Sequence, residues 1–525
     1  MLSFFSRKRI QFAAIAGIAL VAGASCGGSG GNSTTPSPVA RPVLDATYRA
    51  SGHAAAGDVF VHLFEWSWPA VATECETRLG PQGFKAVQIS PPQEDITGDQ
   101  WWTRYQPVSY GIDKSRSGTR TEFIDMVNRC KAAGVEIYAD AVINHMTAGS
   151  GTGRNGTSYS HYNYPGLYSA GDFHSSCSIS NYQDAANVQD CELVGLADLK
   201  TESDTVREKI ASYLVSLSDL GVAGFRIDAA KHIQPVDLNA IIGKVNQAIA
   251  AKGRALPYYF LEVIDYGSEA VKARDYFGEG YSSSGSSDIT EFKFRGIGDK
   301  FLGSGGQKLA QLNPNGLSGS QFSESAWGLM PSDKAVVFVE NHDSQRNGGL
   351  WYRDGALYRL ANVWMLAQPY GYPSVMSSFG FDRSSQSSRD AGPPPAALGC
   401  ASSIDAAKVG EWVCEHRDAS IGSMVAFRRV AAGAPVANWW DNGTNAIGFS
   451  RGAKGFVAIN AESAITIQHT FATGLPAGSY CNILTGKLIA NACSGQSVTV
   501  DSFGAAALTL APRTAVVLQH DQLVR

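Results

Sequence analysis

Short apolar segments typical of strands alternate with longer amphipathic segments typical of helices along most of this chain. The first unit has a strand-like run at 59–64, a helical pattern around 70–79 and another strand-like run at 86–89. Regular alternation of strand and helix favours a parallel sheet, because each parallel connection must cross back over the sheet. Roughly eight such units precede Gly380, which favours a closed (β/α)8 TIM barrel over an open sheet.

Two regions interrupt this alternation. Residues 145–199 stand between the third strand and its expected helix, and they are rich in Gly, Ser, Asn and Tyr. A loop of that length in a compact enzyme is usually a functional insertion. Beyond residue 433 short strand-like runs with turn signals replace the helical period, which predicts a C-terminal antiparallel β-sandwich. The predicted domains are therefore the barrel at 46–144 and 200–433, the insertion at 145–199 and the sandwich at 434–525.

The first 25 residues read as a secretory signal peptide. Arg7 and its basic neighbours precede an apolar stretch and a small-residue exit ending at Ser25. The segment is too short and too rich in small residues for a permanent membrane span. Cys26 resembles the lipid-modified cysteine of bacterial lipoproteins, although Gly23 stands where that motif usually has leucine. We expect an exported protein, either lipid-anchored at Cys26 or cleaved in the ordinary way, with 26–45 as a flexible linker.

The cysteines fit an oxidising compartment. Nine are present, and Cys26 is the natural odd one if the other eight pair. Metal-type CxxC spacing is absent, and the exported context favours disulfides. Spacing alone does not choose among the 105 connectivities that eight cysteines allow. The sequence-near couples are Cys75 with Cys130, Cys177 with Cys191, Cys400 with Cys414, and Cys481 with Cys493.

The charge balance gives no sign of two classes of partner. The formal net charge is −4, from 43 basic and 47 acidic residues without long runs. Neither a nucleic acid nor an anionic membrane surface is indicated as a partner. An uncharged or mixed ligand and a monomeric protein are expected.

Three acidic residues follow three strand-like runs. Arg226 and Asp228 lie two residues apart, so the period of two points both to one side of a strand. A guanidinium beside a carboxylate lowers its pKa, which predicts an ionised, nucleophilic Asp228. Glu262 ends the next apolar run and Asp343 follows a later one. Three acids at three strand ends indicate one active site.

Four ordered segments carry a specific resemblance. Residues 140–145, 224–232, 260–264 and 338–343 resemble the four ordered sequence regions of the α-amylase family, glycoside hydrolase family thirteen. The segment 101–110 further resembles the animal-type branch, which is also found in bacteria. The similarity runs from about Val59 to the C-terminus.

The resemblance implies the catalytic and substrate-binding residues. A retaining glycosidase needs a nucleophilic carboxylate and a protonated carboxyl group about 5 to 5.5 Å apart. Asp228 is the expected nucleophile, Glu262 in its apolar setting is the expected proton donor, and Asp343 stabilises the oxocarbenium-like transition state. A structural ion pair is the alternative for any one of these acids. The implied substrate-binding residues are Trp101, Trp102, Tyr105, Gln106, His145, Arg226, Lys231, His232 and His342.

The resemblance also implies a calcium site and raises the question of chloride. Asn144, Asp198 and the backbone carbonyls of Gln189 and His232 match the family's calcium ligands, and all are hard oxygen donors. Turn or helix capping is the alternative role for Asn144 and Asp198. Animal relatives bind chloride with Arg226, Asn341 and a further arginine, but that last position is Gly380 here. Chloride dependence is therefore not expected.

These patterns predict an α-amylase that cleaves internal α-1,4 bonds of starch or glycogen with retention. A transglycosylase or an exo-acting maltooligosaccharide-forming relative is one alternative. A non-catalytic glucan-binding surface protein is another, and a reducing-sugar assay on soluble starch separates it from an enzyme.

Overall fold

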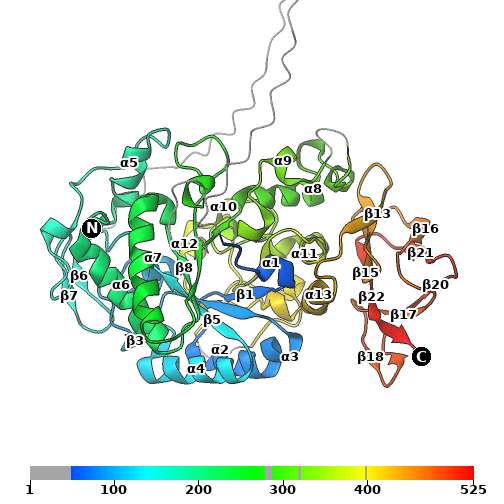
Figure 1. The fold of residues 1–525 in the computed structure, drawn as a ribbon, viewed down its shortest axis with the longest axis horizontal. Coiled ribbons are helices and arrows are strands. Elements are labelled where there is room, and N and C mark those ends of the chain that lie inside the picture. The colour runs from blue at the N-terminus through cyan, green and yellow to red at the C-terminus, as the bar shows by residue number, and fades with distance from the viewer. Residues whose placement is uncertain (1–48, 278–286, 317–320, 396–398) are drawn as a thin grey trace, which may run out of the picture. The chain divides into compact units, whose positions relative to one another are not determined.

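Eight parallel strands close into a barrel at the centre of the protein. The computed structural model describes residues 49–277, 287–316, 321–395 and 399–525. The strand order around the barrel is β1-β12-β11-β10-β9-β8-β5-β2 (Figure 1). The predicted TIM barrel is therefore confirmed. The strands are β1 (Phe60–Leu63), β2 (Ala86–Ile89), β5 (Glu136–Ala141), β8 (Gly224–Ile227), β9 (Tyr258–Leu261), β10 (Asp288–Thr290), β11 (Ala335–Val337) and β12 (Tyr372–Ser377).

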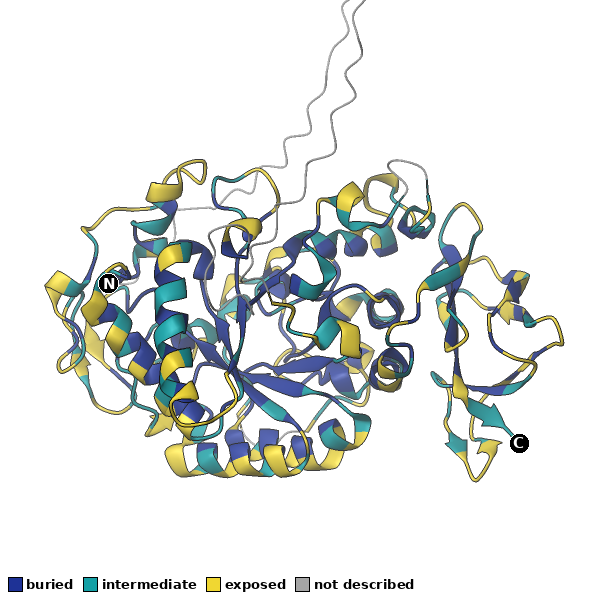
Figure 2. Cartoon of the chain, viewed as in Figure 1, coloured by how far each residue is buried: buried dark blue, intermediate teal, exposed yellow. Residues whose placement is uncertain are grey.

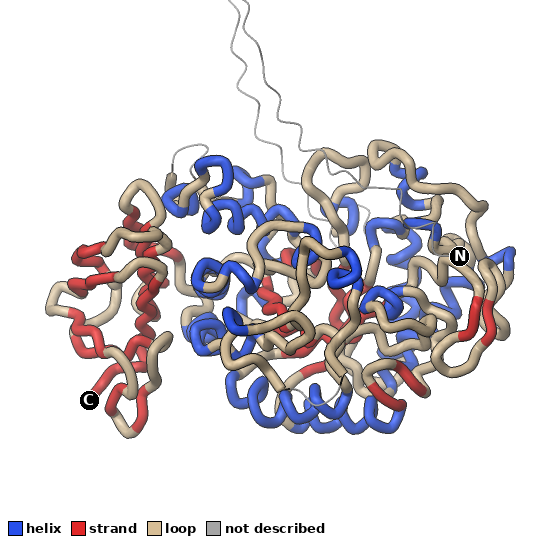
Figure 3. The backbone as a smooth tube through the Cα atoms, turned by 180° about the vertical axis from the view of Figure 1, so that it is seen from behind, coloured by secondary structure: helices blue, strands red, loops and turns tan. Residues whose placement is uncertain are grey.

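Helices cover the outside of the barrel, buried on their inner faces and exposed on their outer ones (Figures 2 and 3). The longer ones are α2 (Trp68–Glu74), α4 (Arg120–Ala132), α6 (Asp204–Asp219), α7 (Pro235–Ala250), α8 (Ile297–Leu302), α11 (Ala356–Ala367) and α13 (Ala419–Val430). The short ones are α1 (His53–Ala56), α3 (Gly80–Gln82), α5 (Ala185–Gln189), α9 (Glu324–Trp327), α10 (Ser344–Asn347) and α12 (Gln386–Asp390). No helix in the described part of the chain combines the length and the apolar character that a membrane crossing requires.

The local sequence explains where α4 begins and which face it buries. The Thr119 hydroxyl accepts the backbone N–H of Glu122 at 3.3 Å, and the Glu122 carboxylate accepts the Thr119 N–H at 2.8 Å. This reciprocal capping box satisfies two N–H groups that the helix start leaves unpaired. Phe123, Val127 and Cys130 share the buried face, as the helical period predicts. A disulfide joins Cys130 to Cys75 at the end of α2.

Large side chains fill the end of the barrel at which the strands begin. Phe60, Tyr138, Phe260 and Tyr372 pack together there with Ala86 and Val336. The Phe60 ring centroid lies 4.8 Å from that of Tyr372 and 5.4 Å from that of Phe260. This aromatic floor closes the barrel interior, so a ligand can enter only where the strands end.

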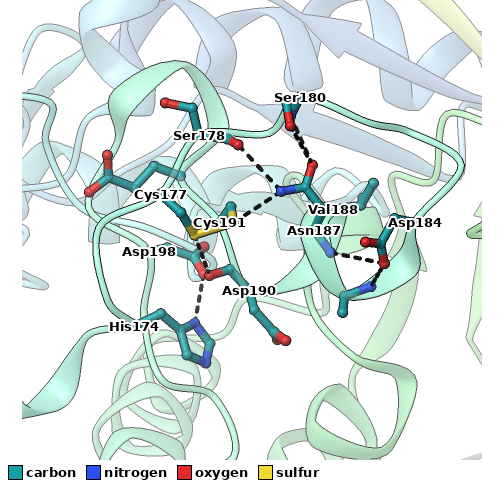
Figure 4. The surroundings of a disulfide bond; sticks show 12 residues. His174, Cys177, Ser178, Ser180, Asp184, Asn187, Val188, Asp190, Cys191 and Asp198 are labelled. Carbon is teal, nitrogen blue, oxygen red and sulfur yellow. Dashed lines mark hydrogen bonds and ion pairs between the residues drawn. A yellow bond between two sulfur atoms is a disulfide. The ribbon is translucent and has the colours of Figure 1, made fainter.

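A long irregular segment follows β5 and precedes α6. It contains the hairpin β6 (Gly151–Thr152) and β7 (Ser158–Tyr159), together with α5. The Glu94 carboxylate, in the loop after β2, accepts the N–H of Asn155 at 2.8 Å and the hydroxyl of Thr157 at 2.8 Å. A disulfide between Cys177 and Cys191 encloses α5 (Figure 4). The segment is therefore bonded both to itself and to the barrel.

The C-terminal residues form antiparallel sheets. A six-stranded sheet has the order β13-β14-β15-β22-β17-β20, and a two-stranded sheet pairs β16 with β21. Alternate residues of these two sheets pack into a separate core that includes Phe456, Phe471 and Leu518. The predicted C-terminal β domain is thus confirmed. The strands are β13 (Val436–Asp441), β14 (Ala446–Arg451), β15 (Gly455–Asn460), β16 (Ile467–Ala472), β17 (Gly478–Asn482), β20 (Ser497–Val500), β21 (Ala505–Leu510) and β22 (Thr514–Val524).

Four small strands complete the described structure: β3 (Lys114–Ser115) pairs with β4 (Gly118–Thr119), and β18 (Leu488–Ile489) pairs with β19 (Ala492–Cys493). Two further disulfides join Cys400 to Cys414 and Cys481 to Cys493. All four sequence-near cysteine couples therefore form disulfides. The signal peptide and the tether predicted before residue 46, with Cys26, lie outside the described residues.

Arg451, at the end of β14, joins the C-terminal domain to the barrel. Its guanidinium donates to the carbonyls of Ala367 at 2.5 Å, Ala434 at 2.9 Å and Ala431 at 3.0 Å. Burial lowers the pKa of Arg451 to about 10, so the group stays charged at neutral pH. This one side chain therefore donates hydrogen bonds both to the last carbonyl of α11 and to two carbonyls in the linker after α13.

Replacing Arg451 with Met should destabilise the protein by about 3 kcal/mol, because three carbonyls lose a charged hydrogen-bond donor. Chemical denaturation with calcium held constant measures the loss. Lys454→Met is the control, since the exposed Lys454 donates to only one carbonyl, that of Ala432 at 2.8 Å. Equal losses for the two variants would contradict the role of Arg451.

Candidate active site

Three carboxyl groups surround the guanidinium of Arg226 where the barrel strands end. Arg226 Nη1 lies 2.6 Å from Asp140 Oδ1 and 2.8 Å from Asp228 Oδ1. Its Nη2 lies 2.6 Å from Glu262 Oε1. Asp140 belongs to β5, Arg226 to β8, and the other two acids directly follow β8 and β9. Three adjacent strands thus bring their charges to one buried cation that is 4% exposed.

Burial of three acids around a single cation raises the pKa values of Asp228 and Asp140. Burial raises the pKa of Asp228 well above its ordinary value; Arg226 opposes this shift, while Glu262 and Asp140 add to it. Burial likewise raises the pKa of Asp140 to about 6, although Arg226 and Tyr105 bond to it. Arg226 does act to lower the pKa of Asp228, as expected, but burial outweighs it, so the expectation of a pKa below the ordinary value is wrong for the ligand-free protein. A buried group of acids with raised pKa values can keep a proton near neutral pH.

A turn after β8 holds the second oxygen of Glu262. The backbone N–H of Ala229 donates to Glu262 Oε2 at 2.9 Å. Ala229 has φ of 50°, in the left-handed region that residues other than glycine adopt at a cost in free energy. That conformation aims the N–H of Ala229 at the carboxyl group. The end of β8 therefore orients the acid that follows β9.

Asp343 lies at the start of α10, beyond the end of β11. Its side chain is 36% exposed, and its Oδ2 lies 3.5 Å from His342 Nε2. Among the described residues none donates a hydrogen bond to this carboxyl group. The backbone of the turn, rather than a side-chain partner, therefore sets the direction of Asp343.

Aromatic and histidine rings form one wall beside these acids. The rings of Tyr105 and His342 stack with centroids 5.3 Å apart, and Trp101 meets His342 edge-on at 5.6 Å. The Tyr105 hydroxyl donates to Asp140 Oδ2 at 3.0 Å, and the Tyr105 carbonyl lies 3.0 Å from His145 Nε2. Burial lowers the pKa of His145 to about 4 and that of His342 well below its ordinary value. Both imidazoles are therefore neutral hydrogen-bonding groups at pH 7.

The other predicted substrate-binding residues lie on neighbouring segments. Gln106 accepts the N–H of Ala148 through Oε1 at 3.2 Å, which links the Trp101–Tyr105 turn to the long segment after β5. The Lys231 ammonium donates to the Ile264 carbonyl at 2.7 Å. Trp102 shares the turn of Trp101 and is half-buried, but no ring in the described part of the chain stacks on it.

The structure adds site residues that the sequence reasoning did not select. Asp140 is one, although an acid inside an apolar strand signals a buried charge that needs a partner. Tyr182 and Glu269 are others: Glu269 forms an ion pair with Lys231, and the Lys231 ammonium lies 5.1 Å from the Tyr182 ring centroid. Their positions in irregular loops carried no periodic signal that could have identified them.

Oxygen atoms gather where the segment after β5 meets the barrel. Asn144 Nδ2 donates to Asp198 Oδ1 at 3.3 Å, and His232 Nδ1 lies 2.9 Å from the carbonyl of Val188 in α5. The carbonyls of Gln189 and His232 accept no hydrogen bond from any described residue. These four groups fit calcium, because each offers a hard oxygen atom. A metal site built from three or more His, Cys, Asp or Glu side chains does not occur among the described residues.

The surroundings of Asp198 support that reading. His174 Nδ1 lies 2.7 Å from Asp198 Oδ2, while the other carboxylate oxygen faces Asn144. The disulfide Cys177–Cys191 stands next to this pair and holds the end of α5 in place (Figure 4). A neighbouring residue that orients a ligand in this way is common at metal sites.

Gly380, where the sequence resemblance implies a chloride-binding arginine in animal relatives, has no room for a side chain and is not among the residues that line the cavity beside Arg226. A Cβ on Gly380 would lie 2.0 Å from the carbonyl oxygen of Lys408. Arg383 is engaged elsewhere: it donates to the carbonyls of Gln345 at 2.5 Å and Gly349 at 3.0 Å. A cavity of about 30 Å³ beside Arg226 and Asn341 accommodates a ligand the size of water. Arg226 is the only cation among its lining residues.

Comparisons with known proteins give a consistent result. Residues 83–375 match the family described as "Alpha amylase, catalytic domain", and residues 437–521 match "Alpha amylase, C-terminal all-beta domain". The chain is 48% identical over 463 residues to an α-amylase of Streptomyces violaceus, covering 88% of this chain and 74% of that protein. It is 45% identical over 467 residues to an α-amylase of Tenebrio molitor, covering 86% of this chain and 94% of that protein.

A solved structure has the same fold. It is a mutant of α-amylase I from Eisenia fetida in complex with maltohexaose. The TM-score is 0.77 at 37% sequence identity, and the alignment covers 88% of this chain and 97% of that one.

Proposed function

The chain belongs to the α-amylase family of glycoside hydrolases, and from that membership we propose the role that each of its three carboxyl groups plays in hydrolysis. The activity is that of an α-amylase on starch and maltooligosaccharides. The observation that carries the proposed roles is the arrangement of Asp228 and Glu262 on one guanidinium, with Asp343 at the start of α10.

In the first step, Asp228 attacks the anomeric carbon while Glu262 gives its proton to the leaving glycosidic oxygen. The bond to the leaving chain breaks as a covalent bond between the sugar and Asp228 forms. Glu262, now ionised, then takes a proton from water, and that water displaces Asp228 with overall retention. Arg226 stabilises whichever of the two carboxylates carries the charge at each stage.

The remaining groups hold the sugar. Asp343 faces the positive charge that develops on the sugar ring, and the neutral imidazoles of His145 and His342 hydrogen-bond to its hydroxyl groups. The Tyr105 ring offers an apolar face next to Asp140 for stacking. Because this wall is fixed by its own contacts, it needs little reorganisation when the substrate binds.

Glu262→Gln tests the proton donor. The two side chains are nearly isosteric, so the fold should persist while hydrolysis of starch falls by about 10²- to 10⁴-fold. A glycoside with an activated leaving group needs less protonation, so its bond-breaking step should lose much less. Stopped-flow measurement of leaving-group release separates that step. Equal losses on starch and on the activated glycoside would remove Glu262 from this role.

A bound calcium ion is the second part of the proposal. The family commonly binds calcium, and the oxygen ligands named above, those of Asn144, Gln189, Asp198 and His232, would hold the ion in this chain. An ion held by these ligands would join the segment after β5 to the turn after β8. In this chain Asn144 and Asp198 border that segment, and His232 follows Asp228 closely, so the site couples the segment to the catalytic turn.

Removing calcium should lower the melting temperature, because an ion that binds only the folded state stabilises it by about 2.7 kcal/mol at a hundredfold excess over its dissociation constant. Calorimetry of the purified protein before and after chelation measures the change, and added calcium should restore it. Asn144→Ala should abolish the calcium response but leave the melting temperature of the chelated protein within a few degrees. An unchanged melting curve after verified metal removal would refute the site.

Export is the third part of the proposal. Four disulfides within the described residues suit an oxidising compartment. The leader at 1–25 and the lipidation of Cys26 rest on the sequence alone. Mass spectrometry of the mature N-terminus distinguishes a lipid-modified Cys26 from ordinary cleavage.

Activity should be nearly independent of chloride. An anion beside Glu262 would need several positive donors, yet Arg383 is bonded to backbone carbonyls and Gly380 has no space for a side chain. The test is the initial rate on soluble starch between pH 5 and 9, with chloride exchanged for gluconate at constant ionic strength. A severalfold rise in rate with chloride, together with an upward shift of the alkaline limb, would contradict this prediction.

A further inference from the structure

A fully buried polar cluster lies behind the turn that carries Asp343. It consists of Gln345 in α10, Ser378 after β12, and Glu415, none of them more than 1% exposed. Glu415 Oε2 accepts the Ser378 N–H at 2.8 Å, and its Oε1 accepts the Ser378 hydroxyl at 2.5 Å. Gln345 Nε2 lies 3.3 Å from Glu415 Oε1 and 3.0 Å from the Ser378 oxygen. Glu415 thus joins segments far apart in sequence.

Gln345 connects this cluster to the backbone of the catalytic turn. Its N–H donates to the Asn341 carbonyl at 3.0 Å, so the residue closes the turn 341–345. The Asp343 carbonyl in turn accepts the N–H groups of Arg346 at 2.9 Å and Asn347 at 3.1 Å. Since no described side chain donates to the Asp343 carboxyl group, the position of this backbone decides where the carboxyl group lies.

Glu415 itself is held from the opposite side. The next residue, His416, lies 2.8 Å through Nε2 from Glu74 Oε1, and Arg417 Nε donates to the same oxygen at 2.7 Å. The preceding residue, Cys414, is bonded to Cys400. The turn that bears Glu415 therefore has covalent and ionic fixation that does not pass through Asp343.

A second buried acid, Glu340, lies near Glu415 without breaking the hydrogen bonds of Glu415. Burial raises the pKa of Glu340 to about 8, and the charge of Glu415 adds to that shift. Burial also raises the pKa of Glu415, to about 7, so near neutral pH the two acids can share one proton and avoid facing each other as two negative charges. Glu415 can therefore stay in contact with its hydrogen-bond donors although two carboxyl groups share this interior.

We propose that Glu415 is a positioning residue for Asp343, which it holds through Gln345 and Ser378 in the direction that catalysis requires. This inference rests on the proposed role of Asp343. By bonding to both Gln345 and Ser378, the carboxyl group of Glu415 holds α10 close to the end of β12. When these hydrogen bonds are lost, the turn can move away from the cleaved bond while the rest of the cleft is unchanged.

The test compares Glu415→Gln with Glu74→Gln. Each variant replaces one buried carboxylate. Glu415 belongs to the turn 415–417 and contacts Gln345, which follows Asp343, whereas Glu74 bonds to that turn from outside and does not contact Gln345. Glu415→Gln places an NH2 group against the donors of Ser378 or Gln345. We expect kcat on maltooligosaccharides to fall about tenfold or more with KM nearly unchanged, since a small misplacement of a catalytic group is costly. Glu74→Gln should lower the melting temperature with kcat within twofold of the parent, because the disulfide between Cys414 and Cys400 still fixes the turn that bears Glu415.

Further variants keep the outcome decisive. Gln345→Met removes the link to Glu415 at similar volume and should reproduce the fall in kcat, even if Glu415→Gln does not fold. Asp343→Asn, measured in parallel, tests the role of Asp343 separately, so failure of that role is distinguishable from failure of the positioning. Full kcat in both Glu415→Gln and Gln345→Met, or an equal fall in kcat for Glu74→Gln, would overturn the proposal.

Discussion

The buried guanidinium of Arg226 is the interaction on which the rest of this active site depends. Its three carboxyl partners come from the ends of β5, β8 and β9, and each would be costly to bury without it. Removing the cation would leave acids that repel one another in a closed barrel. The barrel geometry and the ion pairs of Arg226 therefore stabilise each other. Catalytic carboxyl groups can be buried where the strands end because Arg226 compensates their charge.

Much of the fold follows from sequence patterns because its determinants are local. The capping box at Thr119 and the apolar face of α4 can be read within fifteen residues, and the period-two spacing of Arg226 and Asp228 directs both to one side. The expected boundaries of the insertion and of the sandwich remain predictions. The strand β10 has only three residues, and so short a run carries almost no periodicity from which the sequence could predict it.

The parts of the site that the sequence does not predict depend on distant partners. The spacing places Arg226 beside Asp228, but Asp140 and Glu262 contact Arg226 as well. Burial raises the pKa of Asp228, and the two neighbouring acids add to that rise. The contact between Gln345 and Glu415 spans 70 residues of sequence and has no local signature. Sequence spacing can indicate which face of a strand an acid occupies, whereas its electrostatic surroundings are set by the closure of the barrel.

The position of Arg451 has a consequence for the order in which the protein can mature. The carbonyls of Ala367, Ala431 and Ala434 belong to the barrel helix α11 and the linker, yet their donor is a residue of the second sandwich strand. During synthesis the barrel sequence is finished before that strand exists, because α13 ends at Val430 and β14 ends at Arg451. Until the C-terminal strands are made, these three carbonyls lack the donor that Arg451 provides. A chain truncated before residue 451 should therefore be cleaved more readily by proteases beside α11.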